Sequence, residues 1–135
     1  MDSLVVLILI VVLVWSATFF SSHYVSFAVG DSMEPTFLGC ALLAINTDSL
    51  PQDLASGEVV VVELDEPQNG FDRIVHRVVE NLPGEEKFST RGDNDVYYDF
   101  PSSIDGYFPY SAFQGKVAHY INLPLEACND MGGED

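Results

Sequence analysis

Hydrophobic residues follow two distinct patterns along this chain. Residues 4–20 form an uninterrupted apolar stretch, LVVLILIVVLVWSATFF, with no charge and no helix breaker. Its length is at the short end of the roughly 17–25 residues that a helix needs to cross a bilayer. Trp15 and Tyr24 near its end are residue types that gather at membrane–water interfaces. We expect residues 1–22 to be a retained, single-span transmembrane anchor.

Two other interpretations of this stretch fit the sequence less well. A cleaved signal peptide begins with a basic segment, whereas only Met1, Asp2 and Ser3 precede the apolar residues. A buried core helix would need an apolar surround that a domain of this size hardly supplies. Neither flank carries Lys or Arg, so charge gives no orientation for the anchor.

The rest of the chain has the residue pattern of β-strands. Alternating or β-branched runs separated by turn residues predict strands, and no long amphipathic helical pattern interrupts them. We expect a mainly β fold, a compact and mostly antiparallel domain over residues 23–128, followed by a frayed acidic tail over residues 129–135. The predicted strands cover residues 24–29, 41–45, 58–64, 72–79, 87–90 and 114–121.

Acidic residues strongly outnumber basic ones in this chain. It has 21 acidic and five basic residues, a formal net charge of −16. Such a surface repels phosphate backbones, so we expect no nucleic-acid partner. A hydrophobic fraction of 47% with nine Phe is too high for a disordered acidic chain. Adaptation to high salt, where these charges are screened, and a generically acidic protein both fit the composition.

Cys40 and Cys128 are far apart in the sequence. They either form one disulfide, if the domain lies outside the cytoplasm, or remain two separate buried hydrophobic residues. The sequence leaves both possibilities open. No pair of Cys or His has the spacing of a zinc site, and we expect neither a metal nor a cofactor.

Ser32 is the candidate nucleophile. It lies in residues 30–36, GDSMEPT, directly after a predicted strand. Gly and Pro on either side can hold a serine on a tight turn beside exposed backbone N–H groups, as acyl transfer requires. The simpler interpretation is an ordinary turn serine. A serine hydroxyl needs a base to become a nucleophile.

His76 is the candidate base. It lies within residues 74–79, IVHRVV, where strand alternation places it on the same face as Ile74 and Val78. One interpretation is a core histidine bonded to a backbone carbonyl. The other is a neutral imidazole held in a cleft, ready to accept a proton. His23 and His119 have no comparable setting, and we expect both to be structural.

A third cluster contains acidic residues. Residues 92–99 read GDNDVYYD and include Asp93, Asp95 and Asp99. A carboxylate here can orient the histidine and stabilise its protonated form. Oxygens at alternate positions also suit Ca²⁺. The spacing lacks the central Gly and terminal Glu of an EF-hand, which weakens the calcium interpretation.

Three segments together resemble the conserved boxes of signal peptidase I. They are residues 32–36, SMEPT, residues 74–78, IVHRV, and residues 91–94, RGDN, in this order. The resemblance is to the archaeal and endoplasmic-reticulum branch, whose base is histidine, and not to the bacterial branch, whose base is lysine. Residues 57–61 and 115–117 also resemble the strand before the histidine box and the closing strand.

The resemblance implies a Ser–His–Asp peptidase that cleaves signal peptides after small residues on the outer side of the membrane. Ser32 and His76 match the family's nucleophile and base. Asp93 and Asp99 match its two aspartates, and the later position implies Asp99 as the triad acid with Asp93 in support. The implied partners are preprotein signal peptides and the membrane. Asp31 departs from the family, which usually has a small neutral residue there.

Two alternatives belong to other classes. A membrane-anchored acidic interaction protein with Ca²⁺ in the loop of residues 93–99 would give Ser32 no role. A self-cleaving repressor-type or pilin-processing protease would use different chemistry, and the repressor type needs a lysine base that neither Lys87 nor Lys116 supplies. The discriminating observation is whether Ser32 Oγ lies within hydrogen-bond reach of His76.

Overall fold

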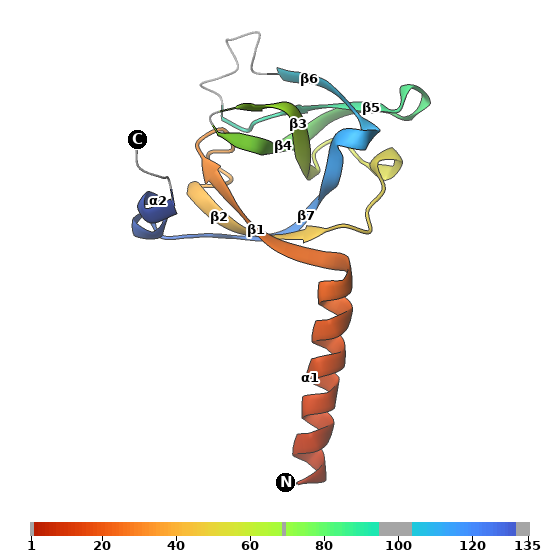
Figure 1. Cartoon of the computed structure of the whole chain (residues 1–135), viewed down its shortest axis with the longest axis vertical. Coiled ribbons are helices and arrows are strands. Elements are labelled where there is room, and N and C mark those ends of the chain that lie inside the picture. Colours follow the sequence, from red (N-terminus) through yellow and green to blue (C-terminus); the bar gives the residue numbers. More distant parts are fainter. Residues whose placement is uncertain (1, 69, 95–103, 132–135) are drawn as a thin grey trace.

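A computed structural model of the chain describes residues 2–68, 70–94 and 104–131 (Figure 1). Two helices, seven strands and three short 3₁₀ turns are assigned in these residues. The helices are α1 (Ser3–Ser22) and α2 (Leu125–Met131). The strands are β1 (His23–Gly30), β2 (Gly39–Asn46), β3 (Val59–Gln68), β4 (Phe71–Leu82), β5 (Lys87–Arg91), β6 (Ile104–Pro109) and β7 (Phe113–Asn122). The 3₁₀ turns are η1 (Pro51–Asp53), η2 (Pro83–Glu85) and η5 (Tyr110–Ala112).

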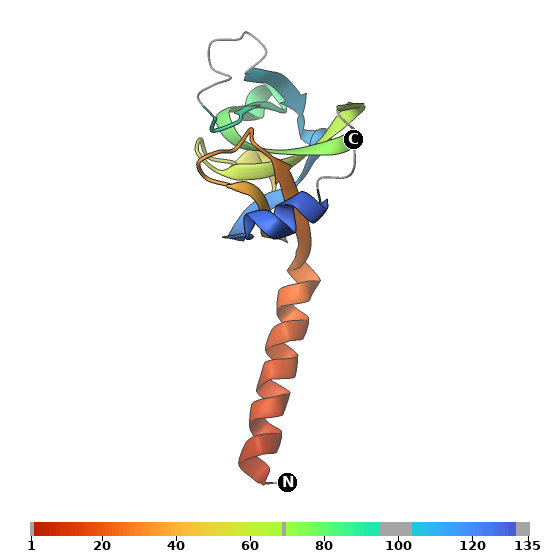
Figure 2. The same cartoon turned by 90° about the vertical axis from the view of Figure 1, so that its left-hand side faces the viewer.

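Helix α1 projects from the β domain as a separate rod (Figures 1 and 2). None of its side chains is buried against the domain. Within the described residues it is the one helix that is long and apolar enough to cross a membrane. The chain passes directly into β1, and the His23 ring stacks on Phe19 at a centroid distance of 4.3 Å. The helix predicted in residues 1–22 is confirmed, and its length and composition fit a single span.

The strands form one antiparallel sheet in the order β1-β2-β7-β3-β4-β5-β6. The mainly β, antiparallel fold predicted from the sequence is confirmed. Strands β1, β2 and β7 lie next to the anchor, whereas β3 to β6 form the part of the domain farther from it (Figure 1). Residues of β1 and β4 line one cleft although the two strands are not neighbours in the sheet.

The core consists of two hydrophobic clusters that share β3. Val61 packs into a cluster with Met33, Phe37, Ala41, Leu43 and Ile45. Val60 and Val62 pack into the other cluster, with Leu54, Val78 and Phe88. Alternate residues of a strand point to opposite faces, so β3 is buried on both sides. This explains why its sequence, VVVV, is a continuous apolar run rather than an alternating one.

Two elements of the fold were not predicted. Strand β6 contains Gly106, with φ of +82°, and ends at Pro109. Gly and Pro are depleted in strands, and an edge strand tolerates them because only one side must pair. Helix α2 was not expected either, and it continues to Met131, into the first residues of the segment expected to be a frayed tail.

A disulfide between Cys40 and Cys128 holds α2 against the sheet. The two Cα atoms are 5.3 Å apart and the sulfurs 2.01 Å. This resolves the question that the sequence left open. The bridge connects the second residue of β2 to the C-terminal helix over a separation of 88 residues, which constrains the unfolded chain strongly.

Candidate active site

Ser32 lies in the loop that connects β1 to β2, which we call the nucleophile loop (residues 31–38). Gly30 and Gly39 face each other where the two strands end, and both have positive φ values, +118° and +90°. Met33 and Phe37 are 3% and 2% exposed, so their burial fixes the loop on the core. Ser32 is half-buried and lines a cleft.

The central observation is a contact between the two residues predicted as nucleophile and base. His76 Nε2 lies 3.0 Å from Ser32 Oγ, although the residues are 44 positions apart. His76 is on β4, an interior strand of the sheet. It pairs with the fully buried Val60 of β3. The pairing of β4 with β5 begins only at Arg77, so the neighbouring β5 ends beside His76. This leaves room for the nucleophile loop to approach the imidazole.

The segment after β5 closes around this pair. A Cβ at Gly92 would collide with the carbonyl oxygen of Ser32 and lie 3.3 Å from His76 Nε2. Asn94 donates its backbone N–H to Ser32 O at 3.0 Å and its side-chain amide to Asp31 O at 2.9 Å. Residues 92–94 therefore hold the backbone of Ser32 in place.

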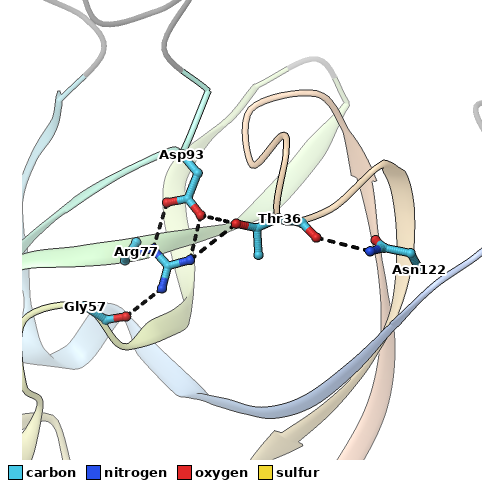
Figure 3. Close-up of polar contacts among 5 residues, drawn as sticks. All are labelled: Thr36, Gly57, Arg77, Asp93 and Asn122. Atoms are coloured by element: carbon cyan, nitrogen blue, oxygen red, sulfur yellow. Dashed lines mark hydrogen bonds and ion pairs between the residues drawn. The ribbon is translucent and has the colours of Figure 1, made fainter.

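Asp93 forms an ion pair with Arg77, the residue that follows His76. Arg77 donates from Nε to Asp93 Oδ1 at 2.8 Å and from Nη2 to Oδ2 at 2.6 Å (Figure 3). Thr36 Oγ1 donates to the same Oδ2 at 2.5 Å. The Arg77 hydrogen bonds lower the pKa of Asp93 below its usual value, and the Thr36 bond adds to this against the opposing effect of burial. Asp93 is therefore an ionised carboxylate at neutral pH.

The other acidic residues of the predicted cluster cannot be placed in this way. Asp95 and Asp99 lie outside the described residues, so Asp99 as triad acid stays a prediction, as does the Ca²⁺ loop over residues 93–99. The described residues contain no group of three or more His, Cys, Asp or Glu that could hold a metal ion. The first acidic residue of that loop, Asp93, is bound to Arg77 and Thr36.

The Ser32–His76 pair opens into a cleft of about 610 Å³ between β1 and the first half of β4. Its apolar lining includes Met33, Ile45 and Val61 from the core cluster. Asp31 also lines it, so the charge that departs from the family pattern lies at the cleft. The lining residues are Tyr24, Ser26, Phe27, Ala28, Val29, Gly30, Asp31, Ser32, Met33, Phe37, Ile45, Val61, Phe71, Asp72, Arg73, Ile74, Val75, His76 and Gly92.

Several residues of the site had no role assigned from the sequence. Arg77, Thr36 and Asn94 were part of the recognised segments, but their partners lie 16 to 63 positions away. The signal that was present is composition: an arginine within an apolar strand needs a counter-charge, because an unpaired charge is costly to bury. Which carboxylate supplies it depends on the tertiary fold.

Comparisons with models of protein families, with curated proteins and with solved structures found no match to this chain. The chemistry of the site therefore rests on its own geometry.

Proposed function

We propose that this chain is a membrane-anchored serine endopeptidase that removes signal peptides from exported preproteins, as the resemblance to signal peptidase I implies. The observation that carries the proposal is the 3.0 Å contact between Ser32 Oγ and His76 Nε2 at a cleft with an apolar lining. A serine and an imidazole at hydrogen-bond distance are the minimal unit of nucleophilic acyl transfer.

In the proposed reaction, Ser32 Oγ attacks the scissile carbonyl carbon while His76 Nε2 accepts the hydroxyl proton. The backbone N–H of Ser32 helps to stabilise the resulting oxyanion. Collapse of the tetrahedral intermediate breaks the C–N bond, and His76 gives its proton to the departing amine. A water molecule then attacks the acyl ester with His76 again as base, and the proton returns to Ser32 Oγ.

The two aspartates have different proposed roles. By the resemblance, Asp99 is the acid that holds His76 in the reactive tautomer and stabilises its protonated form. Asp93 instead stabilises the site through Arg77 and Thr36, because both of its carboxylate oxygens accept hydrogen bonds from them. Specificity for small side chains is proposed to come from shallow apolar pockets that exclude larger ones by steric clash.

One feature supports a position of the catalytic domain outside the cytoplasm, and a second supports a position close to the membrane. The Cys40–Cys128 disulfide is of a kind that persists in oxidising compartments and is rare in the cytosol. The nucleophile lies ten residues beyond Ser22, the last residue of α1, which holds the site near the membrane surface. A substrate that is still embedded in the bilayer then meets the site at a high effective concentration.

The competing interpretation, an acidic Ca²⁺-binding or interaction protein on the same anchor, has no explanation for the Ser32–His76 contact. It predicts that the Ser32 hydroxyl is dispensable. The peptidase proposal requires it, so one substitution separates the two.

The test is processing of a reporter preprotein by the full-length chain in proteoliposomes. Ser32→Ala is expected to abolish cleavage while the protein stays folded, because it removes one hydroxyl from a loop. Losing the nucleophile of a triad costs many orders of magnitude in rate. Ser111→Ala changes an exposed serine of η5; it is the matched control and should process normally. Cleavage by Ser32→Ala at the wild-type rate would refute the peptidase proposal.

A further inference from the structure

The nucleophile loop lies outside the sheet, so the position of Ser32 depends on contacts that the loop makes. Its first half is held by Asn94, which bonds to Asp31 O and Ser32 O. Its second half is held around Thr36, the residue four positions after the nucleophile. Thr36 is half-buried and is the point where three separate elements meet (Figure 3).

Thr36 connects the nucleophile loop to the strand that carries the base. Its hydroxyl donates to Asp93 Oδ2 at 2.5 Å. The same carboxylate is held by Arg77, the residue directly after His76 in β4, and Arg77 also donates to Gly57 O at 2.7 Å. A movement of Thr36 would therefore change the distance between the loop and β4, where the Ser32–His76 contact is made.

Asn122 holds the backbone of the same residue from the opposite side. Its side-chain amide donates to Thr36 O at 3.2 Å and accepts from Leu38 N at 3.0 Å. Asn122 is the last residue of β7, and the next residue is fixed as well, since Leu123 N donates to Cys40 O at 3.2 Å. The Cys40–Cys128 disulfide also joins β2 to the helix that follows β7, so the end of β7 that carries Asn122 is held by several contacts.

We infer that Thr36, assisted by Asn122, is a positioning residue that keeps Ser32 Oγ within reach of His76. The inference rests on the proposed function and extends it to residues that touch neither the substrate nor the reacting atoms. The pairing of nucleophile and base tolerates little displacement, because a misplacement of about 1 Å can cost about a hundredfold in rate. The effect is expected on kcat rather than KM, since Thr36 and Asn122 do not line the cleft.

The test compares Thr36→Val with Thr36→Ser in the full-length chain, using the reporter preprotein. Valine has the shape of threonine without its hydroxyl, whereas serine keeps the hydroxyl. We expect Thr36→Val to lower kcat by about 10- to 100-fold with KM unchanged, and Thr36→Ser to restore most of it. Asn122→Ala should lower kcat less while its Tm stays close to wild type, because its side chain is exposed.

Two controls separate this inference from a general effect on folding. Gln114 is on β7, the strand that also carries Asn122. Gln114→Ala removes an exposed side-chain hydrogen bond to Glu63 of β3 and should leave kcat and Tm unchanged. Amide exchange at Leu38, which needs no activity, should accelerate in Asn122→Ala, because the substitution removes the acceptor of the Leu38 N–H. Unchanged exchange would overturn the part assigned to Asn122.

Equal kcat for Thr36→Val and Thr36→Ser, or a loss that only follows the unfolded fraction, would overturn the inference and leave the peptidase proposal intact. If wild type and Ser32→Ala were indistinguishable, the proposed function itself would fail and the inference with it.

Discussion

Polar side chains around Ser32 link segments that are far apart in the sequence. His76 Nε2 lies 3.0 Å from Ser32 Oγ, while its sequence neighbour Arg77 pairs with Asp93. The candidate nucleophile and base could be predicted from sequence, because short segments around them carry recognisable residue types. The pairing of Arg77 with Asp93 and Thr36 could not, because it depends on where β5 ends relative to the nucleophile loop.

The lowered pKa of Asp93 makes a pH-dependent prediction. A carboxyl group whose pKa is lower in the folded than in the unfolded state stabilises the fold above its unfolded pKa, about 3.9. That contribution is lost as the pH falls through the lower, folded pKa. We expect Asp93→Asn to melt below wild type at pH 7, because Arg77 loses its counter-charge, and this difference to shrink as the pH drops below about 4.

Thermal unfolding of both proteins between pH 3 and pH 7, together with turnover at pH 7, is the measurement. Asp99→Asn is the comparison, because the family resemblance assigns it to the chemistry, so it should lower turnover with little change in Tm. A fully stable Asp93→Asn protein without activity would instead exchange the two roles and make Asp93 the triad acid.

At the scale of elements, the site forms where the nucleophile loop, β4 and the segment after β5 meet. The strands were predictable because alternation and β-branched runs are local signals. Strand β6, with its glycine and proline, and helix α2, with seven residues, are formed by tertiary contacts and were missed. The close approach of Gly92 to Ser32 could not be predicted either, because it joins residues 60 positions apart in the sequence.

A substitution at Gly92 tests the contact between the nucleophile loop, β4 and the segment after β5. Gly92→Ala would place a methyl group against the Ser32 carbonyl oxygen and close to His76 Nε2. Since backbone cannot yield as a flexible side chain does, we expect the loop to be displaced. Overpacking should lower the free energy of unfolding by about 1–3 kcal/mol, and turnover should fall.

Gly84→Ala is the matched control, because nothing lies within 4 Å of a Cβ at that position. Both variants are measured for preprotein cleavage and for unfolding in denaturant. Normal turnover in Gly92→Ala would show that the approach between the loop and residue 92 is looser than the structure has it.

At the scale of the whole molecule, the acidic charge is the dominant property. Among the described residues, Arg77 pairs with Asp93, Lys87 with Glu85 and Lys116 with Glu58, and the whole chain has only five basic residues. Most of the 21 acidic residues therefore have no basic partner available and repel one another. Such self-repulsion destabilises a compact state and is screened as the Debye length falls from about 10 Å at 0.1 M salt to about 3 Å at 1 M.

We therefore expect the Tm of the full-length protein to rise as KCl increases from about 0.1 M to 1 M, the range over which the Debye length falls. The double variant Asp65→Asn/Glu66→Gln removes two exposed charges at the end of β3 and should show a smaller rise. A Tm that is independent of salt, or the same slope for both proteins, would favour a generically acidic surface over adaptation to high salt.

The central claim, that Ser32 and His76 act as one catalytic unit, is tested most directly by a double-substitution cycle. Turnover of a reporter preprotein is measured for wild type, Ser32→Ala, His76→Ala and the double variant, each checked for folding by its Tm. Residues that act as a unit are strongly non-additive. We predict that each single variant loses about a thousandfold or more in kcat and that the double variant loses no more than Ser32→Ala alone. Full turnover in His76→Ala, or losses that multiply in the double variant, would contradict the account.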